Sequence, residues 1–331
     1  MQAFLERVWF GGGRGGWLLA PLEWLFIIIS SLRRFAYRRR LLASFHPGRP
    51  VVVVGNLTVG GSGKTPTIIW LANALSDRGL RVGVISRGYG GSDSGPSEVQ
   101  STSNPERVGD EPVLIARRTR ARVVVARDRV AAAAQLAPAV DVMLADDGLQ
   151  HYRLARDLEI AVVDARRGFG NEHRLPRGPM RESRSRLSSV AAVIVTGEGD
   201  PGVPGIRSRL VPTSLVPLGG GPRVVLDEWA GRRVHAVAGI GDPERFFRTL
   251  EAAGLHVIRH PKPDHARLAA QDVEFADGFP VLMTEKDAVK CRSFARAGLY
   301  YLEVCAQPEA VAADRLVERI LALVAQRKGS T

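Results

Sequence analysis

VVVVGNLTVGGSGKT, residues 51–65, joins four consecutive valines to a glycine-rich turn that ends in Lys64 and Thr65. A run of β-branched residues predicts a fully buried strand, and residues 66–75 after the turn predict a helix. A strand, a glycine-rich loop, Lys-Thr and a helix together are the layout of a P-loop. In such a loop, backbone N–H groups and the helix N-terminus converge on one point, where they favour an anion. We therefore expect this segment to bind nucleotide phosphates.

The residues of this loop are expected to contact different parts of the nucleotide and its metal ion. Lys64 can reach the β- and γ-phosphates, and the Thr65 hydroxyl can contact Mg²⁺. The usual pattern, G-x-x-x-x-G-K-[ST], has glycine where this chain has Thr58. A glycine-rich hairpin with a chance GKT is the alternative, but the strand before it and the helix after it favour the P-loop. The residues predicted to bind the nucleotide are Thr58, Val59, Gly60, Gly61, Ser62, Gly63, Lys64 and Thr65.

Two acidic residues follow another apolar segment, residues 140–145, which predicts a strand. Asp146 and Asp147 come directly after it. Downstream of a P-loop this is the Walker-B layout, in which a carboxylate holds Mg²⁺ directly or through water. An acidic turn is the alternative. His151 follows closely enough to contact substrate or phosphate, although a lone histidine is more often a structural hydrogen-bonding group.

Other polar residues follow strands or begin helices in the same half of the chain. Arg87 lies in the turn after the predicted strand 81–85, at the sheet edge where open α/β folds bind ligands. Asp110 and Glu111 begin a predicted helix, where capping and catalysis are both open interpretations. Arg181 belongs to a loop, residues 174–182, whose arginines, prolines and glycine suit an acidic ligand. A solvated basic loop is the alternative there.

The N-terminal region differs in character from the rest. Residues 17–30 are apolar and rich in tryptophan, with Pro21 and Glu23 as interruptions, and five arginines follow within residues 33–40. The run is shorter than the roughly 20 residues of a spanning helix. An amphipathic helix lying on an anionic membrane fits this pattern best. A tilted membrane span, or a helix packed on the protein's own core, is the alternative.

The net charge indicates the kind of partner, and the cysteines indicate the redox compartment. The formal net charge of +12 favours an acidic partner, such as a phosphorylated substrate, an anionic lipid or nucleic acid. A genomic bias toward arginine would give the same excess. Cys291 and Cys305 lack the spacing of a metal site, so a reducing compartment is expected.

Strands and helices alternate from residue 49 onward, which predicts an α/β fold with a mostly parallel sheet. Residues 201–222 are rich in Gly and Pro and suggest a connection between domains. We predict an N-terminal membrane-interface helix (1–48), a P-loop core (49–218) and a smaller α/β domain (219–331). The remaining expected elements are a loop at 92–104, strands at 122–126, 158–164, 190–196, 233–239, 255–259, 280–283 and 300–304, and helices at 128–136, 244–253, from 263, and at 309–325.

Six motifs, taken together and in this order, resemble one enzyme family. They are GNLTVGGSGKTP (55–66), SRGYGG (86–91), GDEP (109–112), DDGLQH (146–151), RGPMRE (177–182) and TEKDAVK (284–290). Each motif alone is weak, but the ordered set is similar to tetraacyldisaccharide 4′-kinases, the lipid A 4′-kinases of Gram-negative bacteria. Thr58 also matches the P-loop of that family.

The resemblance implies a phosphotransferase that moves the γ-phosphate of ATP, with Mg²⁺, to the 4′-hydroxyl of tetraacyldisaccharide 1-phosphate. It implies a catalytic Asp110 paired with His265 of the second domain, together with Lys64. That segment often has two consecutive histidines, whereas this chain has His265-Ala266. The implied metal-site residues are Thr65, Asp146, Asp147 and Glu111, and His151, Arg181 and Arg87 are the expected substrate contacts. The family also implies a peripheral or monotopic protein on the cytoplasmic face of the inner membrane.

Rival functions fit the residues less well. A P-loop membrane-partitioning ATPase without a small-molecule acceptor is the main alternative. Residues 284–287 do not form the N-K-x-D pattern of guanine specificity. Nucleic-acid binding is suggested by charge alone, and we expect none. The apolar N-terminus argues against a kinase with a soluble acceptor.

Overall fold

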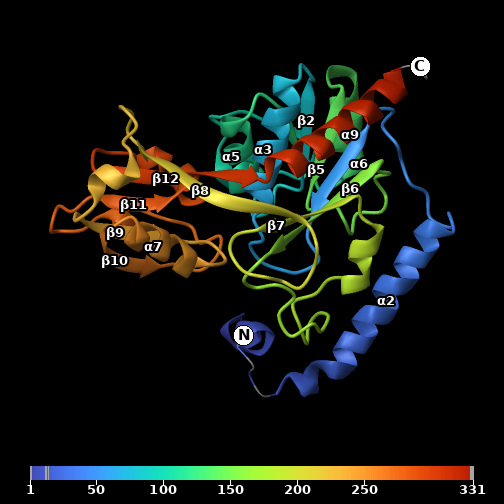
Figure 1. The fold of residues 1–331 in the computed structure, drawn as a ribbon, viewed down its shortest axis with the longest axis horizontal. Helices are drawn as coiled ribbons and strands as arrows, with labels where there is room; N and C mark the ends of the chain where they lie inside the picture. The colour runs from blue at the N-terminus through green and yellow to red at the C-terminus, as the bar shows by residue number, and fades with distance from the viewer. Residues whose placement is uncertain (1, 12, 14, 329–331) are drawn as a thin grey trace.

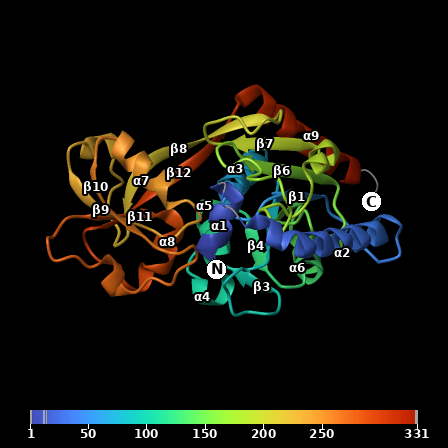
Figure 2. The same ribbon diagram turned by 90° about the horizontal axis from the view of Figure 1, so that it is seen from below.

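The structure is a computed structural model that describes residues 2–11, 13 and 15–328. One continuous 12-stranded sheet runs through it in the order β10-β9-β11-β12-β8-β7-β6-β1-β5-β2-β4-β3. Figures 1 and 2 show a larger lobe around β1 and β5–β7 and a smaller lobe around β9–β11, joined by β8 and β12. The mostly parallel sheet with its covering helices confirms the predicted α/β class.

The strands are β1 (Val51–Gly55), β2 (Val82–Ser86), β3 (Ser97–Val99), β4 (Arg122–Val125), β5 (Val142–Asp146), β6 (Leu158–Asp164), β7 (Ala192–Thr196), β8 (Ile206–Pro217), β9 (Arg233–Ala238), β10 (His256–Pro261), β11 (Val281–Thr284) and β12 (Leu299–Pro308). The α-helices are α1 (Gln2–Phe10), α2 (Ala20–Arg38), α3 (Lys64–Asp77), α4 (Pro105–Val108), α5 (Asp110–Arg118), α6 (Arg129–Leu136), α7 (Pro243–Ala252), α8 (Glu285–Lys290) and α9 (Ala310–Lys328).

The larger lobe is organised around β1. This strand is buried along its whole length and pairs in parallel with β5 on one side and β6 on the other. Helices α3, α5 and α9 contribute to the core on one face of the sheet, and α6 contributes to the core on the other face. Because β1, β2 and β5 are parallel neighbours, the loops after them meet at the same sheet edge.

The terminal helix α9 returns to the larger lobe. Leu316, Val317 and Ile320 are buried in the same core cluster as the β1 residue Val52. The predicted smaller domain extended to residue 331, but its last described helix packs against the lobe that contains β1. The division at residue 218 remains a proposal, and this packing favours grouping α9 with the P-loop core.

The predicted connection at 201–222 contains the 12-residue strand β8, which pairs antiparallel with β12 from Pro217↔Tyr300 to Ser208↔Pro308. The segment joins the two lobes, and it does so as a strand of the sheet rather than as an irregular connection. Two other local expectations were wrong. The predicted loop at 92–104 contains β3, which pairs with β4. The helix expected from residue 263 is absent, because residues 264–265 form a turn. The pairing partners of β8 lie far along the chain, which is why local composition did not reveal that strand.

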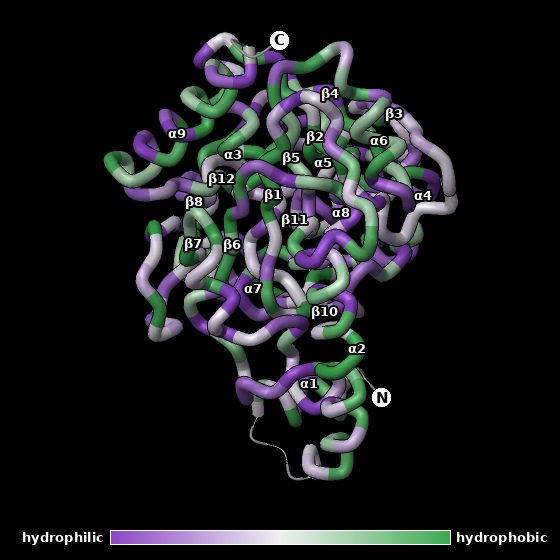
Figure 3. The backbone as a smooth tube through the Cα atoms, turned by 90° about the vertical axis from the view of Figure 1, so that its right-hand side faces the viewer, coloured by the Kyte–Doolittle hydropathy of each residue, from purple (hydrophilic) through white to green (hydrophobic). Residues whose placement is uncertain are grey.

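The N-terminal helices lie outside both lobes (Figures 1 and 3). The helical segment Gly16–Arg38 is long and apolar enough to cross a membrane by length and composition, so the expectation that the run is too short was wrong. Apolar side chains at helical spacing are exposed along it. Those at least half exposed include Trp17, Leu18, Leu22, Trp24, Leu25, Ile28, Ile29, Leu32 and Phe35. The exposed apolar helix is consistent with membrane association.

One acidic side chain ties α2 to the larger lobe. Glu23 is buried and accepts a hydrogen bond from the backbone N–H of Arg174 at 2.8 Å. It also lies 3.3 Å from His173 Nδ1 and 3.4 Å from Arg177 Nη1. These contacts hold the helix beside the loop of residues 173–182.

Candidate functional site

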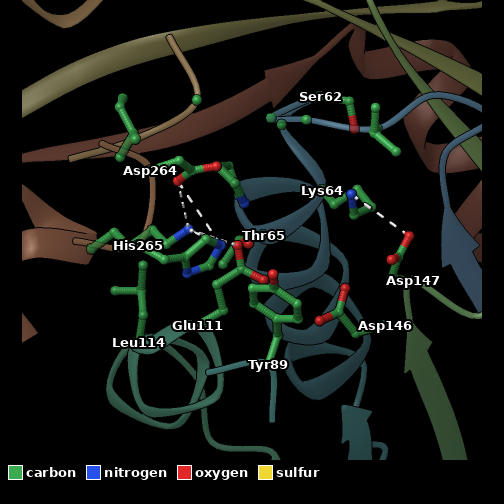
Figure 4. Close-up of a pocket in the computed structure, with 18 of the residues that line it drawn as sticks. Ser62, Lys64, Thr65, Tyr89, Glu111, Leu114, Asp146, Asp147, Asp264 and His265 are labelled. Atoms are coloured by element: carbon green, nitrogen blue, oxygen red, sulfur yellow. Dashed lines mark hydrogen bonds and ion pairs between the residues drawn. The ribbon is translucent and has the colours of Figure 1, made fainter. Parts of the chain in front are cut away.

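A cavity of about 1010 Å³ lies between the two lobes and the N-terminal helix. Its lining includes the P-loop, the acidic edge after β5, Asp264 and His265 of the smaller lobe, and Phe26 and Arg33 of α2. Figure 4 shows several of these side chains pointing toward one another from separate elements. Segments far apart in sequence therefore share one site.

The P-loop has the predicted strand–loop–helix form. Helix α3 begins at Lys64, and Gly63 before it is in the left-handed region with φ 80°. A Cβ at Gly63 would lie 3.0 Å from the side chain of Thr196, so both conformation and space require glycine there. Ser62 is buried and its hydroxyl has no hydrogen-bond partner among the described residues.

Thr58 occupies a position at which glycine is not needed. Its backbone forms an isolated antiparallel bridge with Met180, and the next residue, Val59, donates its N–H to Pro179 O at 2.9 Å. The start of the P-loop is thus attached to the 177–182 segment. An extended backbone suits threonine, so the departure from the usual P-loop pattern carries no strain.

Two neighbouring aspartates at the end of β5 have opposite electrostatic environments. Burial, together with the nearby charges of Glu111 and Asp147, raises the pKa of Asp146 to about 7. Burial acts in the same direction on Asp147, but the charges of Lys64 and Arg181 outweigh it and lower the pKa of Asp147 to about 2. Lys64 Nζ lies 3.7 Å from Asp147 Oδ1, and Arg181 Nη1 lies 2.7 Å from Oδ2.

Each of the two aspartates has one carboxylate oxygen that is buried and accepts no hydrogen bond from any described residue. Ser86 Oγ donates to Asp146 Oδ2 at 3.0 Å, while Asp146 Oδ1 and Asp147 Oδ1 are buried without a hydrogen-bond partner among the described residues. Asp147 adopts φ 49°, a left-handed conformation that aspartate tolerates better than most residues. Glu111 lines the same cavity. Within residues 2–11, 13 and 15–328, no group of three or more His, Cys, Asp or Glu side chains could hold a metal alone.

Asp110 and His265 come together from different lobes. Asp110 is the first residue of α5 and is buried, and its Oδ2 lies 3.3 Å from His265 Nδ1. Burial raises the pKa of Asp110, but His265, Lys286 and Lys290 outweigh this effect and bring it below the ordinary value. Asp110 also accepts a hydrogen bond from the backbone N–H of Glu111 at 2.8 Å, but the N-cap of α5 is Gly109, so the side chain of Asp110 does not cap the helix.

The turn that carries His265 explains why no helix forms there. His265 has φ 58°, and its backbone N–H bonds to Gly239 O at 3.3 Å. A left-handed residue at this point ends any right-handed helix that Pro263 would begin. The turn directs the imidazole toward Asp110, and the ring of Tyr89 lies 4.9 Å from it between centroids.

The three predicted substrate contacts all line the cavity. His151 is partly buried; burial and the charge of Arg129 lower its pKa to about 4, and its Nε2 has no hydrogen-bond partner among the described residues. Arg181 is held by Asp147. Arg87 follows β2, and no hydrogen bond or ion pair with another described residue defines its role. These contacts remain predictions.

No role was predicted for Lys286 from the sequence, although it lies in the TEKDAVK segment. Lys286 Nζ lies 3.3 Å from Glu111 Oε1 and 3.2 Å from His265 Nε2. Burial lowers its pKa, but Glu111, Asp110 and Asp264 outweigh this effect and raise it to about 12. Lys286 lies on α8, which packs against α5 although the two helices are far apart in sequence. No local sequence pattern could therefore predict the contact between Lys286 and Glu111.

Glu182 is another residue for which no role was predicted from the sequence. It is buried, and it accepts hydrogen bonds from Gln150 Nε2 at 2.8 Å and Tyr152 Oη at 3.0 Å. Arg34 of α2 lies 3.6 Å from the same carboxylate. The DDGLQH segment, the RGPMRE segment and the N-terminal helix therefore meet at one buried acid.

Comparisons with known proteins agree with this geometry. The family model described as tetraacyldisaccharide-1-P 4′-kinase matches residues 16–323. A tetraacyldisaccharide 4′-kinase of Methylobacillus flagellatus is 46% identical over 97% of this chain and 97% of that protein. The enzyme of the same name from an Azoarcus species is 49% identical over 94% of each chain.

A solved structure supports the same assignment. The crystal structure of LpxK from Aquifex aeolicus in complex with ATP superimposes with a TM-score of 0.79 at 28% sequence identity. The match covers 93% of this chain and 99% of that one. The chain therefore belongs to the tetraacyldisaccharide-1-P 4′-kinase family.

Proposed function

We propose that this protein transfers the γ-phosphate of ATP to the 4′-hydroxyl of tetraacyldisaccharide 1-phosphate, with Asp110 as the base. The observation that carries this proposal is the contact between the buried Asp110 and His265, whose imidazole lines the cavity that contains the P-loop. A P-loop without an acceptor-activating group would suit an ATPase. A buried carboxylate paired with a histidine that shares its cavity with Lys64 and Thr65 suits transfer to a hydroxyl.

ATP would occupy the P-loop, with residues 58–65 around its phosphates. The ATP complex of the Aquifex aeolicus relative supports this placement. Lys64 is the first residue of α3, and its side chain points into the cavity (Figure 4). Its ammonium would therefore hold the β- and γ-phosphates. Phosphoryl transfer depends mainly on positioning and on compensation of negative charge, and both are within reach of these groups.

The acidic edge fits Mg²⁺. Asp146 and Asp147 each present a buried oxygen without a hydrogen-bond partner among the described residues. The charge of Asp147 also disfavours ionisation of Asp146, and a bound cation would offset that repulsion. Thr65 would add its hydroxyl, and Glu111 is a further candidate whose Oε1 already accepts from Lys286. Mg²⁺ usually takes one or two carboxylates and completes its shell with water and substrate phosphates. When bound, it would supply charge neutralisation at the phosphates.

Asp110 would accept the proton of the acceptor hydroxyl. A sugar hydroxyl is a weak nucleophile near neutral pH, so a positioned base contributes to rate. The pKa of Asp110 lies below its ordinary value, which keeps it ionised and able to accept that proton. Since Asp110 and His265 belong to different lobes, the dyad would be complete only when the lobes are together, which limits transfer to water.

The acceptor would enter from the side of α2. Phe26 and Arg33 of this helix line the cavity, and the row of exposed apolar side chains continues along it. Arg181, His151 and Arg87 would contact the acceptor. The buried Glu23 contacts hold α2 beside the lobe, which supports a helix lying in the membrane interface. We place the protein on the cytoplasmic face of the inner membrane, where ATP is present.

An acceptor-dependent phosphotransfer assay tests this function. Purified protein is mixed with Mg-ATP and tetraacyldisaccharide 1-phosphate in detergent micelles, and 4′-phosphorylated product is measured beside ADP. We expect product and ADP in equal amounts, with little ADP when the acceptor is omitted. ATP hydrolysis that is independent of the acceptor, by folded protein, would instead support a partitioning ATPase.

A further inference from the structure

Lys286 lies where the two lobes meet beside Asp110. It is the second residue of α8, which Thr284 caps by accepting a hydrogen bond from the N–H of Asp287 at 3.2 Å. Asp287 is fully buried and is bonded to Thr284 and to the N–H of Gly239 at 2.8 Å. The helix start is therefore firmly held, and with it the origin of the Lys286 side chain.

The ammonium of Lys286 contacts groups on both lobes. In the smaller lobe it lies 3.2 Å from His265 Nε2 and 3.6 Å from Asp264 Oδ1. In the larger lobe it lies 3.3 Å from Glu111 Oε1, on the residue next to Asp110. Its side chain is only 15% exposed, so water competes little for these contacts.

These contacts determine the tautomer of His265. A lysine ammonium has donors and no acceptor, so the bond to Nε2 requires that this nitrogen accept. The proton of the neutral ring must then be on Nδ1, the nitrogen 3.3 Å from Asp110 Oδ2. The imidazole thereby donates to the carboxylate that would act as base.

We propose that Lys286 is a positioning residue that holds His265 in its Nδ1–H tautomer and so orients Asp110 for proton transfer. This inference rests on the proposed role of Asp110 as base. Lys290 lies 3.7 Å from the same Asp110 oxygen and has no contact with His265 among the described residues, so it supplies charge without selecting a tautomer.

The arrangement determines where the acceptor proton goes. As the 4′-oxygen bonds to the γ-phosphorus, the bond from phosphorus to the ADP oxygen breaks and ADP keeps the electron pair. The hydroxyl proton passes to Asp110. His265 cannot take this proton from Asp110, because the nitrogen that faces the carboxylate, Nδ1, already carries a proton. The histidine therefore orients the carboxylate, and the proton leaves from Asp110 after product formation.

Nitrogen NMR of the imidazoles tests the tautomer without any turnover. The chain has seven histidines, so selective ¹⁵N labelling gives few signals, and His265→Gln identifies the one of interest. In the wild type we expect a protonated Nδ1 and an unprotonated Nε2 at His265. In Lys286→Met we expect Nε2 to become at least partly protonated, while the matched variant Lys290→Met keeps the wild-type pattern. A wild-type ring protonated at Nε2, or one unchanged in Lys286→Met, would overturn the proposal.

Kinetics provide the second measurement. Lys286→Met should lower kcat by about 10- to 100-fold, on the scale of a misplaced catalytic group, and leave KM for ATP within about threefold. Lys286→Arg, which restores a donor-only cation, should recover most of the loss. A Met variant with normal kcat, or an Arg variant no better than Met when both bind ATP normally, would contradict the role. Absence of transfer by the wild type would instead refute the proposed function, and the NMR result would still stand.

Discussion

Replacing Asp146 by asparagine should stabilise the nucleotide-free protein near neutral pH while impairing its activity. Burial, with the charges of Glu111 and Asp147, raises the pKa of Asp146 from 3.8 to about 7. The folded state therefore binds a proton more tightly than the unfolded state, and stability falls as pH rises between these two values. The Asn side chain removes the charge and can still accept the hydrogen bond from Ser86.

The size of the gain follows from the shift. A change of about three pKa units at about 1.4 kcal/mol each gives an upper limit of roughly 4 kcal/mol at about pH 8. Sharing of the effect with Glu111 and Asp147, together with local relaxation, reduces it, so we expect a gain of about 1–3 kcal/mol. At about pH 4 the wild-type carboxyl is protonated in the folded state, and the gain should disappear.

The neighbouring Asp147 is a matched control of opposite sign. Its pKa is lowered to about 2, so its charge stabilises the fold at pH values above 3.8 and that contribution is lost as pH falls through about 2. Asp147→Asn should therefore destabilise the protein by about 1–2 kcal/mol at about pH 8. Asparagine also tolerates the left-handed backbone at this position.

Urea unfolding followed by circular dichroism, without nucleotide or Mg²⁺, measures both variants at about pH 4 and about pH 8. We expect the two variants to move the midpoint in opposite directions at the higher pH. An Asp146→Asn variant that is less stable than the wild type at about pH 8, or whose gain does not change with pH, would refute the electrostatic reasoning.

Two further predictions concern the nucleotide and the membrane. Lys64→Ala should lower turnover by at least about 100-fold, because Lys64 is the P-loop cation. The substitution also removes one of the two cations beside Asp147 and leaves Arg181. A loss below about tenfold in the phosphotransfer assay would contradict the role of Lys64. The double substitution Trp24→Ser with Ile28→Ser removes side chains that are 65% and 53% exposed, and it should weaken binding to anionic vesicles by at least about tenfold while ATP binding is kept. Val311→Ser, at a 62% exposed position on α9, is the control and should bind vesicles like the wild type. Equal vesicle affinity for all three proteins would refute the interfacial role of α2.

The P-loop and the acidic edge were predictable because their signals are local. A run of valines, a glycine-rich turn and Lys64 are adjacent in sequence, and the structure gives them the expected strand–loop–helix form. Asp146 and Asp147, which lie at the end of the predicted strand, likewise lie at the end of β5 in the structure. The match of Asp110 with His265 came from the family resemblance, and no spacing in the chain would have produced it.

The missed features depend on contacts between distant segments. Strand β8 contains Pro, Ser and Thr residues that are typical of a connecting segment. Pairing with β12 nevertheless makes it the longest strand among the described residues. Glu23 was noted only as an interruption of an apolar run, but its partners lie about 150 residues away. Lys286 belongs to the same class, since its contact with Glu111 spans 175 residues. Composition and periodicity contain no information on such pairs.

Turnover of Asp110→Ala, measured beside the wild type with the lipid acceptor, tests the central claim most directly. If Asp110 is the base, transfer to the 4′-hydroxyl should fall by at least about 100-fold while ATP binding is retained. Since Asp110 also accepts a hydrogen bond from the backbone of its own helix, a purely structural role would leave turnover per folded molecule nearly unchanged. A loss of less than about tenfold in folded protein would contradict the proposed mechanism.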